Sequence, residues 1–289
     1  MKTFLTFADS RLKGPSNRIK KQAHRMRFFD KILVLNEKDL DSEFRLKFKD
    51  KLIQGSRGYG YWCWKSQIIL QALEAMHDGD ILCYADTGCH LNPKGRTRLE
   101  YYFQKTEDSP SGILTFQGTW IDAHWTKGDL LKHLDVYSDE TVTHTGTLVA
   151  TTFFIKKSNA TVKLVQNWLG IFESNFSLMD DTPSTTENLN GFKEHRHDQS
   201  AFSILCKKIN ADRLPYSEIQ PHYLENDPKA NEKLESEFQN PIYAKKDWTP
   251  CPTWLRSALK ILVLITPIRS WRKKIRVKYN RTGSYTALK

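Results

Sequence analysis

The sequence predicts an α/β fold in which a mixed, mainly parallel central sheet is flanked by helices. Near the N-terminus, residues 3–7 and 31–36 are short, mostly apolar runs typical of strands. Residues 15–29 between them have a helical pattern with Ser16 as a cap. Such a β-α-β start implies two parallel strands joined by a right-handed crossover. Residues 57–92 continue the pattern as loop, helix, turn, strand and acidic loop.

The helix in this second stretch is predicted by apolar residues that fall on one face. They are Trp64, Ile68, Ile69, Ala72, Leu73 and Met76. Asp78 and Gly79 then end the helix. The following run, residues 80–85, is mostly apolar and suits a strand buried on both faces. It leads directly into Asp86.

Asp86 is a candidate site residue because ligands of open α/β sheets bind at the carboxyl ends of strands. Its carboxylate can hold a ribose hydroxyl, or a divalent cation such as Mn²⁺ or Mg²⁺ that neutralises a diphosphate. Gly88, two residues later, lets a ligand come close to the backbone. The alternative interpretation of a lone strand-end Asp is a turn or cap residue.

Further segments complete the predicted sheet and its helices. Residues 113–116 and 147–156 are β-rich, and the second run is continuous enough for a central strand. Residues 160–172 have a helical apolar pattern. Residues 180–191 form a polar loop of the kind that closes over ligands or connects subdomains.

The loop before the second helix carries aromatic and basic residues suited to a nucleotide. Tyr59 lies between Gly58 and Gly60, and Trp62 lies two residues after Gly60; a flat ring in such a loop can stack on a base or a sugar, a contact worth about 1–3 kcal/mol for a base. Arg57 and Lys65 bracket the rings with positive charge suitable for a diphosphate. A solvated surface position is the alternative for each of these two cations.

Residues 194–200 form a second constellation directly before an apolar helix, residues 201–206. Asp198 has His197 and Gln199 as neighbours and helix N-terminal amides beside it, so its protonation can be tuned by its environment. We assign the chemistry to these three residues. The alternative is that Asp198 only caps the helix.

Three blocks, RGYGYWCWK (57–65), Asp86-Thr87-Gly88 and HRHDQS (195–200), together resemble the donor-site core of bacterial GT-A type glycosyltransferases, the enzymes of capsule and lipopolysaccharide assembly. The similarity covers roughly residues 1–215. It implies a Rossmann-like GT-A fold and transfer of a hexose such as galactose from a UDP-linked donor to a lipid-linked, lipopolysaccharide or capsule glycan. The hallmark of these enzymes is Asp-x-Asp, and Gly88 stands here in place of the second Asp.

The resemblance also implies roles for particular residues. The loop after the first strand lies against the nucleotide base in such proteins, which assigns Asp9 and Arg11 to the donor. A His-Asp-Gln or Asp-Gln pair that faces the transferred sugar matches Asp198 and Gln199.

Two further assignments follow from the same resemblance. A C-terminal His completes metal ligation in several such enzymes, so Asp86 and His222 are the candidate metal ligands, with an ordinary surface histidine as the alternative. Trp125-Thr126-Lys127 resembles a feature near the acceptor or donor sugar, although a helix-capping loop explains Thr126 equally well.

The net charge of +11 lies wholly after residue 240. We therefore predict a neutral glycosyltransferase domain, residues 1–240, and a basic amphipathic tail, residues 241–289. Within the tail, the longest uncharged apolar run, residues 261–268, is far shorter than the roughly 20 residues of a transmembrane helix. Residues 254–281 instead suit a helix lying on an anionic membrane surface.

These features predict a cytoplasmic enzyme, peripheral on the inner face of the cell membrane. Five cysteines without CxxC spacing indicate reduced thiols, and the N-terminus lacks the pattern of a signal peptide. The alternative function is a non-enzymatic nucleotide-binding adaptor that docks on membrane or nucleic acid through the basic tail. No recognised nucleic-acid motif accompanies the charge, so we expect no nucleic-acid partner.

Overall fold

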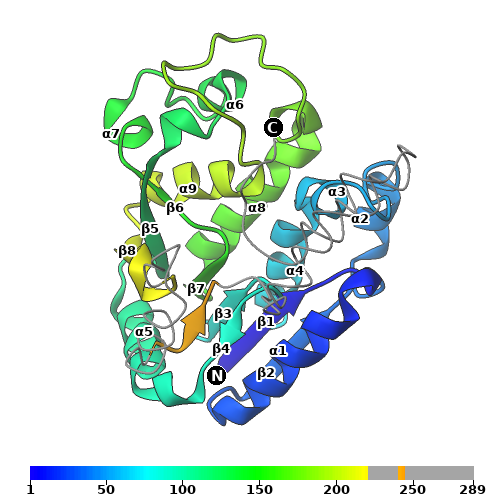
Figure 1. The fold of residues 1–289 in the computed structure, drawn as a ribbon, viewed down its shortest axis with the longest axis vertical. Coiled ribbons are helices and arrows are strands. Elements are labelled where there is room, and N and C mark those ends of the chain that lie inside the picture. The colour runs from blue at the N-terminus through cyan, green and yellow to red at the C-terminus, as the bar shows by residue number, and fades with distance from the viewer. Residues whose placement is uncertain (221–239, 245–289) are drawn as a thin grey trace, which may run out of the picture. The chain divides into compact units, whose positions relative to one another are not determined.

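The computed structural model describes residues 1–220 and 240–244 of the chain. They belong to one compact unit built around a seven-stranded sheet (Figure 1). The strands are β1 (Lys2–Phe7), β2 (Lys31–Leu35), β3 (Ile81–Ala85), β5 (Ile113–Ile121), β6 (Gly146–Leu148), β7 (Thr152–Lys156) and β8 (Asp212–Pro215). Their order is β2-β1-β3-β7-β5-β6, and β8 pairs with β5.

Most strands of this sheet point the same way. β2, β1 and β3 are parallel neighbours, and β8 is parallel to β5. β7 runs antiparallel to both β3 and β5, and β6 runs antiparallel to β5. Five of the seven strands therefore share one direction, which confirms the predicted mixed, mainly parallel sheet.

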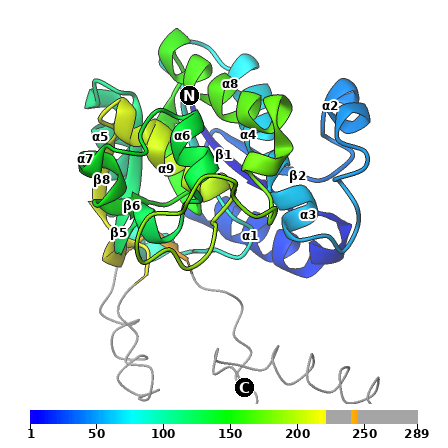
Figure 2. The ribbon, with the colours of Figure 1, turned by 90° about the horizontal axis from the view of Figure 1, so that it is seen from above.

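Helices cover both faces of the sheet (Figures 1 and 2). They are α1 (Lys13–Met26), α2 (Ser42–Lys47), α3 (Gly58–Tyr61), α4 (Cys63–Glu74), α5 (Arg96–Asp108), α6 (Gly128–His133), α7 (Glu140–Thr143), α8 (Asn159–Ser174) and α9 (Asp198–Lys208). Short 3₁₀ turns are η1 (Ser10–Leu12), η2 (Pro93–Gly95), η3 (Asp122–His124), η4 (Phe176–Leu178) and η5 (Tyr216–Glu218).

Two hydrophobic cores lie on opposite faces of the sheet, because successive side chains of a strand alternate between faces. On β3, Leu82 and Tyr84 pack with α4, α8 and α9, whereas Cys83 and Ala85 pack with α1 and α5. β3 is buried along its whole length, as its apolar sequence predicts. The predicted crossover helix between the first two strands is α1, but the predicted cap at Ser16 is wrong, because α1 begins at Lys13 with Leu12 at its N-cap and Ser16 lies inside the helix.

A small second sheet brings a late segment of the chain against the acidic loop. β4 (His90–Leu91) pairs antiparallel with β9 (Ile242–Tyr243). The amide of Asn92 donates to Pro241 O at 2.8 Å, and the amide of Ala244 donates to Ile219 O at 2.7 Å. Residues 240–244 therefore pack on the body. The predicted tail helix, residues 254–281, and His222 lie outside the described residues.

The predicted single strand over residues 147–156 is wrong in one respect, because it is interrupted between β6 and β7. The interruption, residues 149–151, turns two backbone carbonyls toward the end of β3. Ala150 O accepts a hydrogen bond from Lys65 Nζ at 3.3 Å, and Thr151 O accepts from the amide of Asp86 at 2.8 Å. Within residues 1–220 and 240–244, no helix is long and apolar enough to cross a membrane.

Candidate active site

The candidate site lies where β1, β3 and the start of α9 meet. β1 and β3 are parallel neighbours, so Asp9 and Asp86, which follow their carboxyl ends, lie at the same edge of the sheet. Thr87 ties the two loops together: its hydroxyl donates to Phe7 O at 2.5 Å and lies 3.0 Å from the hydroxyl of Thr6.

A buried lysine joins the two predicted key carboxylates. Lys65 Nζ lies 2.7 Å from Asp198 Oδ2 and 3.2 Å from Asp86 Oδ1, and it donates to Ala150 O. Its side chain is 3% exposed, whereas that of Asp86 is 33% exposed. The hydroxyl of Tyr84 also donates to Asp86 Oδ1, at 2.6 Å. We call Asp86, Lys65 and Asp198 the Lys65 cluster.

The electrostatics of the Lys65 cluster hold one cation between two acids. Burial raises the pKa of Asp198 to about 6, against the opposing effect of the Lys65 charge. Burial lowers the pKa of Lys65, but Asp198 and Asp86 outweigh burial, and the net change is upward. Lys65 therefore stays charged, while Asp198 titrates in the range useful for chemistry near neutral pH.

His197 is held in a strained conformation immediately before Asp198. Its φ of 52° and ψ of −120° are unusual for a residue with a side chain. Its Nδ1 lies 2.8 Å from Met179 O, and its ring stacks on Trp62 with centroids 5.7 Å apart. Burial lowers the pKa of His197, so the ring is neutral near pH 7. Asp198 is the first residue of α9 and not its cap, since His197 occupies the cap position.

Residues 58–62, here called the aromatic turn, form one turn of left-handed helix. Their φ values are 58° for Gly58, 53° for Tyr59, 88° for Gly60, 53° for Tyr61 and 61° for Trp62. The amide of Tyr61 donates to Arg57 O at 2.7 Å, and the amide of Trp62 donates to Gly58 O at 3.2 Å. Each residue with a side chain costs roughly 1–2 kcal/mol in this conformation. The sequence predicted a loop here, without this left-handed conformation.

Packing around the aromatic turn holds it in this conformation. The Trp62 ring covers Gly58 so closely that a Cβ at Gly58 would lie 2.4 Å from it. Trp64 Nε1 donates to Gly58 O at 2.9 Å. Asp181, from the polar loop, accepts from the hydroxyl of Tyr61 at 3.0 Å and forms an ion pair with Arg57 at 2.9 Å. Contacts from Trp64 of α4 and from Asp181 of the polar loop therefore hold the turn on two sides.

The remaining predicted donor residues lie at the end of β1. Asp9 caps η1 and pairs with Arg11 through contacts of 2.7 and 2.8 Å, and this hydrogen-bonded pair lowers the pKa of Asp9. The ring of Tyr59 stacks on Phe7 at 6.4 Å. Gln199, in contrast, lies beside Asp198 on the first turn of α9, and its side chain is partly exposed.

The polar loop is anchored by two residues whose role the sequence did not indicate. Lys127 is buried, and its ammonium donates to three backbone carbonyls: that of Ser177 in η4 and those of Asp180 and Thr182 in the polar loop. Asp129 accepts from the amides of Thr185 and Thr186 at 2.8 and 2.7 Å. The partners lie about 50 residues later in the sequence, so spacing gave no signal of them. Neighbouring Trp125 packs its ring under Arg196 at 4.3 Å.

A third unpredicted residue, Arg18 of α1, fixes the acidic loop. Its guanidinium donates to Thr87 O at 2.9 Å and to Cys89 O at 2.7 Å. Arg18 of α1 therefore holds the backbone on both sides of Gly88. A Cβ at Gly88 would have no heavy atom outside residues 87–89 within 4 Å.

The described residues do not fit a divalent-cation site. In the part of the chain that the structure describes, no three His, Cys, Asp or Glu side chains are grouped to hold a metal ion. Asp86 Oδ1 contacts Lys65 and Tyr84, and residue 88 has no carboxylate. Metal ligation by Asp86 and His222 stays a prediction, because His222 lies outside the described residues.

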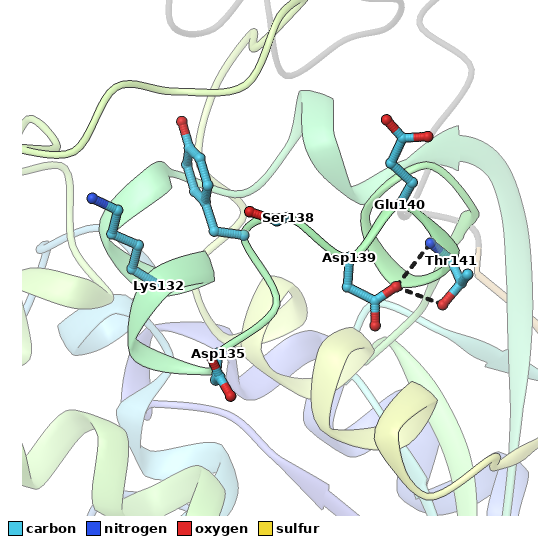
Figure 3. Close-up of a pocket in the computed structure, with 7 residues that line it drawn as sticks. Lys132, Asp135, Ser138, Asp139, Glu140 and Thr141 are labelled. Carbon is cyan, nitrogen blue, oxygen red and sulfur yellow. Dashed lines mark hydrogen bonds between the residues drawn. The ribbon is translucent and has the colours of Figure 1, made fainter.

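A separate hollow of about 700 Å³ lies beside α6 and α7 (Figure 3). It is lined by Lys132, Asp135, Tyr137, Ser138, Asp139, Glu140 and Thr141. Asp139 uses its carboxylate to accept from the amide and hydroxyl of Thr141, at the start of α7. None of the predicted site residues lines this hollow.

Fold and site together define an α/β protein with an acidic, aromatic-lined site at the strand ends. No protein-family model matches the chain, and no curated protein matches its sequence. Solved structures are similar to it in fold.

One is the galactosyltransferase LgtC in complex with donor and acceptor sugar analogs, with 14% identity and a TM-score of 0.45 over 95% of this chain and 100% of that chain. Another is a glycosyltransferase involved in glycosylation of the major capsid of PBCV-1, with 12% identity and a TM-score of 0.42 over 84% and 92%. A third is mouse xyloside xylosyltransferase 1, with 11% identity and a TM-score of 0.41 over 87% and 100%.

Proposed function

We propose that this protein is a GT-A type glycosyltransferase whose donor site is the edge of the sheet around the Lys65 cluster. One observation carries the proposal: a partly exposed carboxylate, Asp86, and a buried one, Asp198, meet at the strand ends beside a rigid aromatic turn. The first suits a hydroxyl of the nucleotide ribose. The second suits a reacting centre that must be shielded from water.

The proposed donor extends across this edge. Its base lies toward Asp9, Arg11 and Tyr59 near the end of β1, its ribose lies toward Asp86, and its diphosphate lies toward Arg57. Trp62, whose ring stacks on His197, lies beside the sugar. We propose a UDP-linked hexose, such as galactose, as the donor.

The proposed transferred sugar lies against Asp198 and Gln199 at the start of α9. An ionised carboxylate there acts as base, nucleophile or stabiliser of an oxocarbenium-like transition state. His197 is buried and neutral, and its contact with Met179 O orients the backbone that carries Asp198. His197 is therefore a positioning residue in this scheme.

The proposed acceptor is a lipid-linked, lipopolysaccharide or capsule glycan. The basic tail brings the enzyme to the anionic inner face of the cell membrane, where such an acceptor is found. This part of the proposal rests on the charge distribution of the sequence, with all of the +11 after residue 240.

The test is release of nucleoside diphosphate from a panel of nucleotide sugars by the full chain. We expect hydrolysis of one donor, and a loss of more than about tenfold in Asp198→Asn, equivalent to about 1.4 kcal/mol. Asp139→Asn, in the separate hollow, is the matched control and should retain the rate. The proposal would be contradicted if the full chain hydrolysed no donor, or if Asp198→Asn and Asp139→Asn hydrolysed the donor at equal rates.

A further inference from the structure

Lys65 occupies the position from which a cation could bridge the two acids of the site. Its ammonium lies within 3.2 Å of oxygens of both Asp86 and Asp198, and the third contact is a backbone carbonyl. Three contacts match the three donors of an ammonium group. The lysine is therefore built into the site and does not extend from it toward solvent.

The charges of the cluster depend on this lysine. The nearby Asp86 carboxylate disfavours ionisation of the buried Asp198, and the ammonium between the two acids offsets this effect. A divalent ion would serve the same purpose, but an ion at Asp86 Oδ1 would lie beside a fixed positive charge. The same oxygen already accepts from Tyr84, and Gly88 supplies no second carboxylate.

We propose that Lys65 is the internal cation of this donor site, so that the site works without a bound divalent metal. Asp86 then holds a hydroxyl of the donor directly through its exposed part. The inference rests on the proposed donor site, and it concerns how that site is charged.

The first test needs no donor. Binding of Mn²⁺ is measured by the loss of the free-ion electron paramagnetic resonance signal for the wild type and for Lys65→Met, Lys65→Arg and Asp86→Asn. We expect no stoichiometric binding by the wild type or by Lys65→Arg, which keeps the charge. Lys65→Met removes the ammonium between two carboxylates and should gain an Mn²⁺ site. Mn²⁺ bound by the wild type and lost in Asp86→Asn would overturn the proposal.

The second test uses whichever nucleotide sugar the full chain hydrolyses. The wild-type rate in EDTA should lie within about twofold of the rate with Mn²⁺, which corresponds to a difference of less than about 0.4 kcal/mol in activation free energy. A donor hydrolysed only with Mn²⁺ would overturn the inference and leave the proposed function standing. If no donor is hydrolysed, the proposed function fails, and the Mn²⁺ measurement still decides the charge assignment. The wild-type measurements remain decisive even if Lys65→Met does not fold.

Discussion

At Asp198, burial and a neighbouring ammonium act in opposite directions on one carboxyl group. Burial raises the pKa to about 6, and Lys65 limits that rise. A carboxylate that works in its ionised form is then inactivated by protonation at mildly acid pH.

We therefore predict that the donor-hydrolysis rate falls as the pH drops through about 6. An Asp with an ordinary pKa near 3.9 would keep its activity down to about pH 4. Lys65→Met removes the positive charge that lowers the pKa of Asp198. The acid limb of this variant's pH–rate profile, measured in EDTA, should therefore move to higher pH. A pH profile that is flat between pH 7 and 5, or a limb that moves to lower pH in Lys65→Met, would contradict this assignment.

The exposed acid of the cluster gives a second prediction. Asp86→Ala should abolish donor turnover while the chain stays folded, because Asp86 is partly exposed at the end of a buried strand. Circular dichroism checks the fold, and nucleoside diphosphate release checks the activity. Turnover near the wild-type level would show that the donor does not use this strand end.

The individual residues of the cluster were predictable from sequence, but their meeting was not. Asp86 follows an apolar run and Asp198 precedes one, which are patterns that sequence shows. Lys65 was expected near a diphosphate, and the structure instead places its ammonium under the site between both acids. The sequence separations of residues 65, 86 and 198 do not indicate that the Lys65 ammonium lies within 3.2 Å of both carboxylates.

At the scale of elements, the aromatic turn stores strain beside the site. Gly58 and Gly79 both have positive φ, but a Cβ at Gly58 would collide with the Trp62 ring, whereas one at Gly79 would meet nothing within 4 Å. The two glycines therefore separate the effect of the backbone conformation from the effect of packing.

We predict that Gly58→Ala lowers the free energy of unfolding by about 1–3 kcal/mol more than Gly79→Ala, since overpacking adds to the conformational cost. For a chain of this size, each kcal/mol corresponds to a fall of about 2–4 °C in Tm. Equal thermal shifts for the two variants would show that the Trp62 ring does not hold the turn.

The polar loop gives a second prediction at this scale. Lys127→Met removes the ammonium that binds the carbonyls of Ser177, Asp180 and Thr182, so those carbonyls lose a buried donor. Amides of residues 177–187 should exchange with solvent at least about tenfold faster, which corresponds to about 1.4 kcal/mol. Lys132→Met, exposed on the same helix α6, is the control. Unchanged exchange in Lys127→Met would contradict the anchoring role.

Element boundaries followed the sequence where local patterns decide them. α4 and β3 appear where the apolar pattern predicts them. The break between β6 and β7 and the left-handed turn were not predictable, because both depend on partners distant in sequence, Lys65 for the first and Asp181 for the second.

At the scale of the whole molecule, a neutral body precedes a strongly basic tail. Residues 240–244 pack on the body through β9 and the contact of Ala244 with Ile219. A truncation that leaves the body intact therefore ends after Ala244, and it still removes the whole basic surplus, because residues 241–244 are uncharged and the surplus begins at Lys245.

We predict that the full chain sediments with anionic liposomes and that a chain ending at Ala244 does not. Each Lys or Arg near an anionic surface contributes about 1 kcal/mol, and six of them lie between Arg269 and Lys278. Binding should weaken at high salt. Equal sedimentation of the two chains would contradict the membrane-anchor proposal. Tighter binding of the full chain to nucleic acid than to liposomes would instead favour the alternative that the basic tail docks on nucleic acid.

The most direct test of the account is a crystal structure of the full chain with UDP. We predict that the nucleotide lies at the carboxyl ends of β1 and β3, with its ribose at Asp86 and with Lys65 still between Asp86 and Asp198. A nucleotide bound in the hollow beside α6 and α7, or a metal ion that displaces Lys65 from Asp86, would contradict the account.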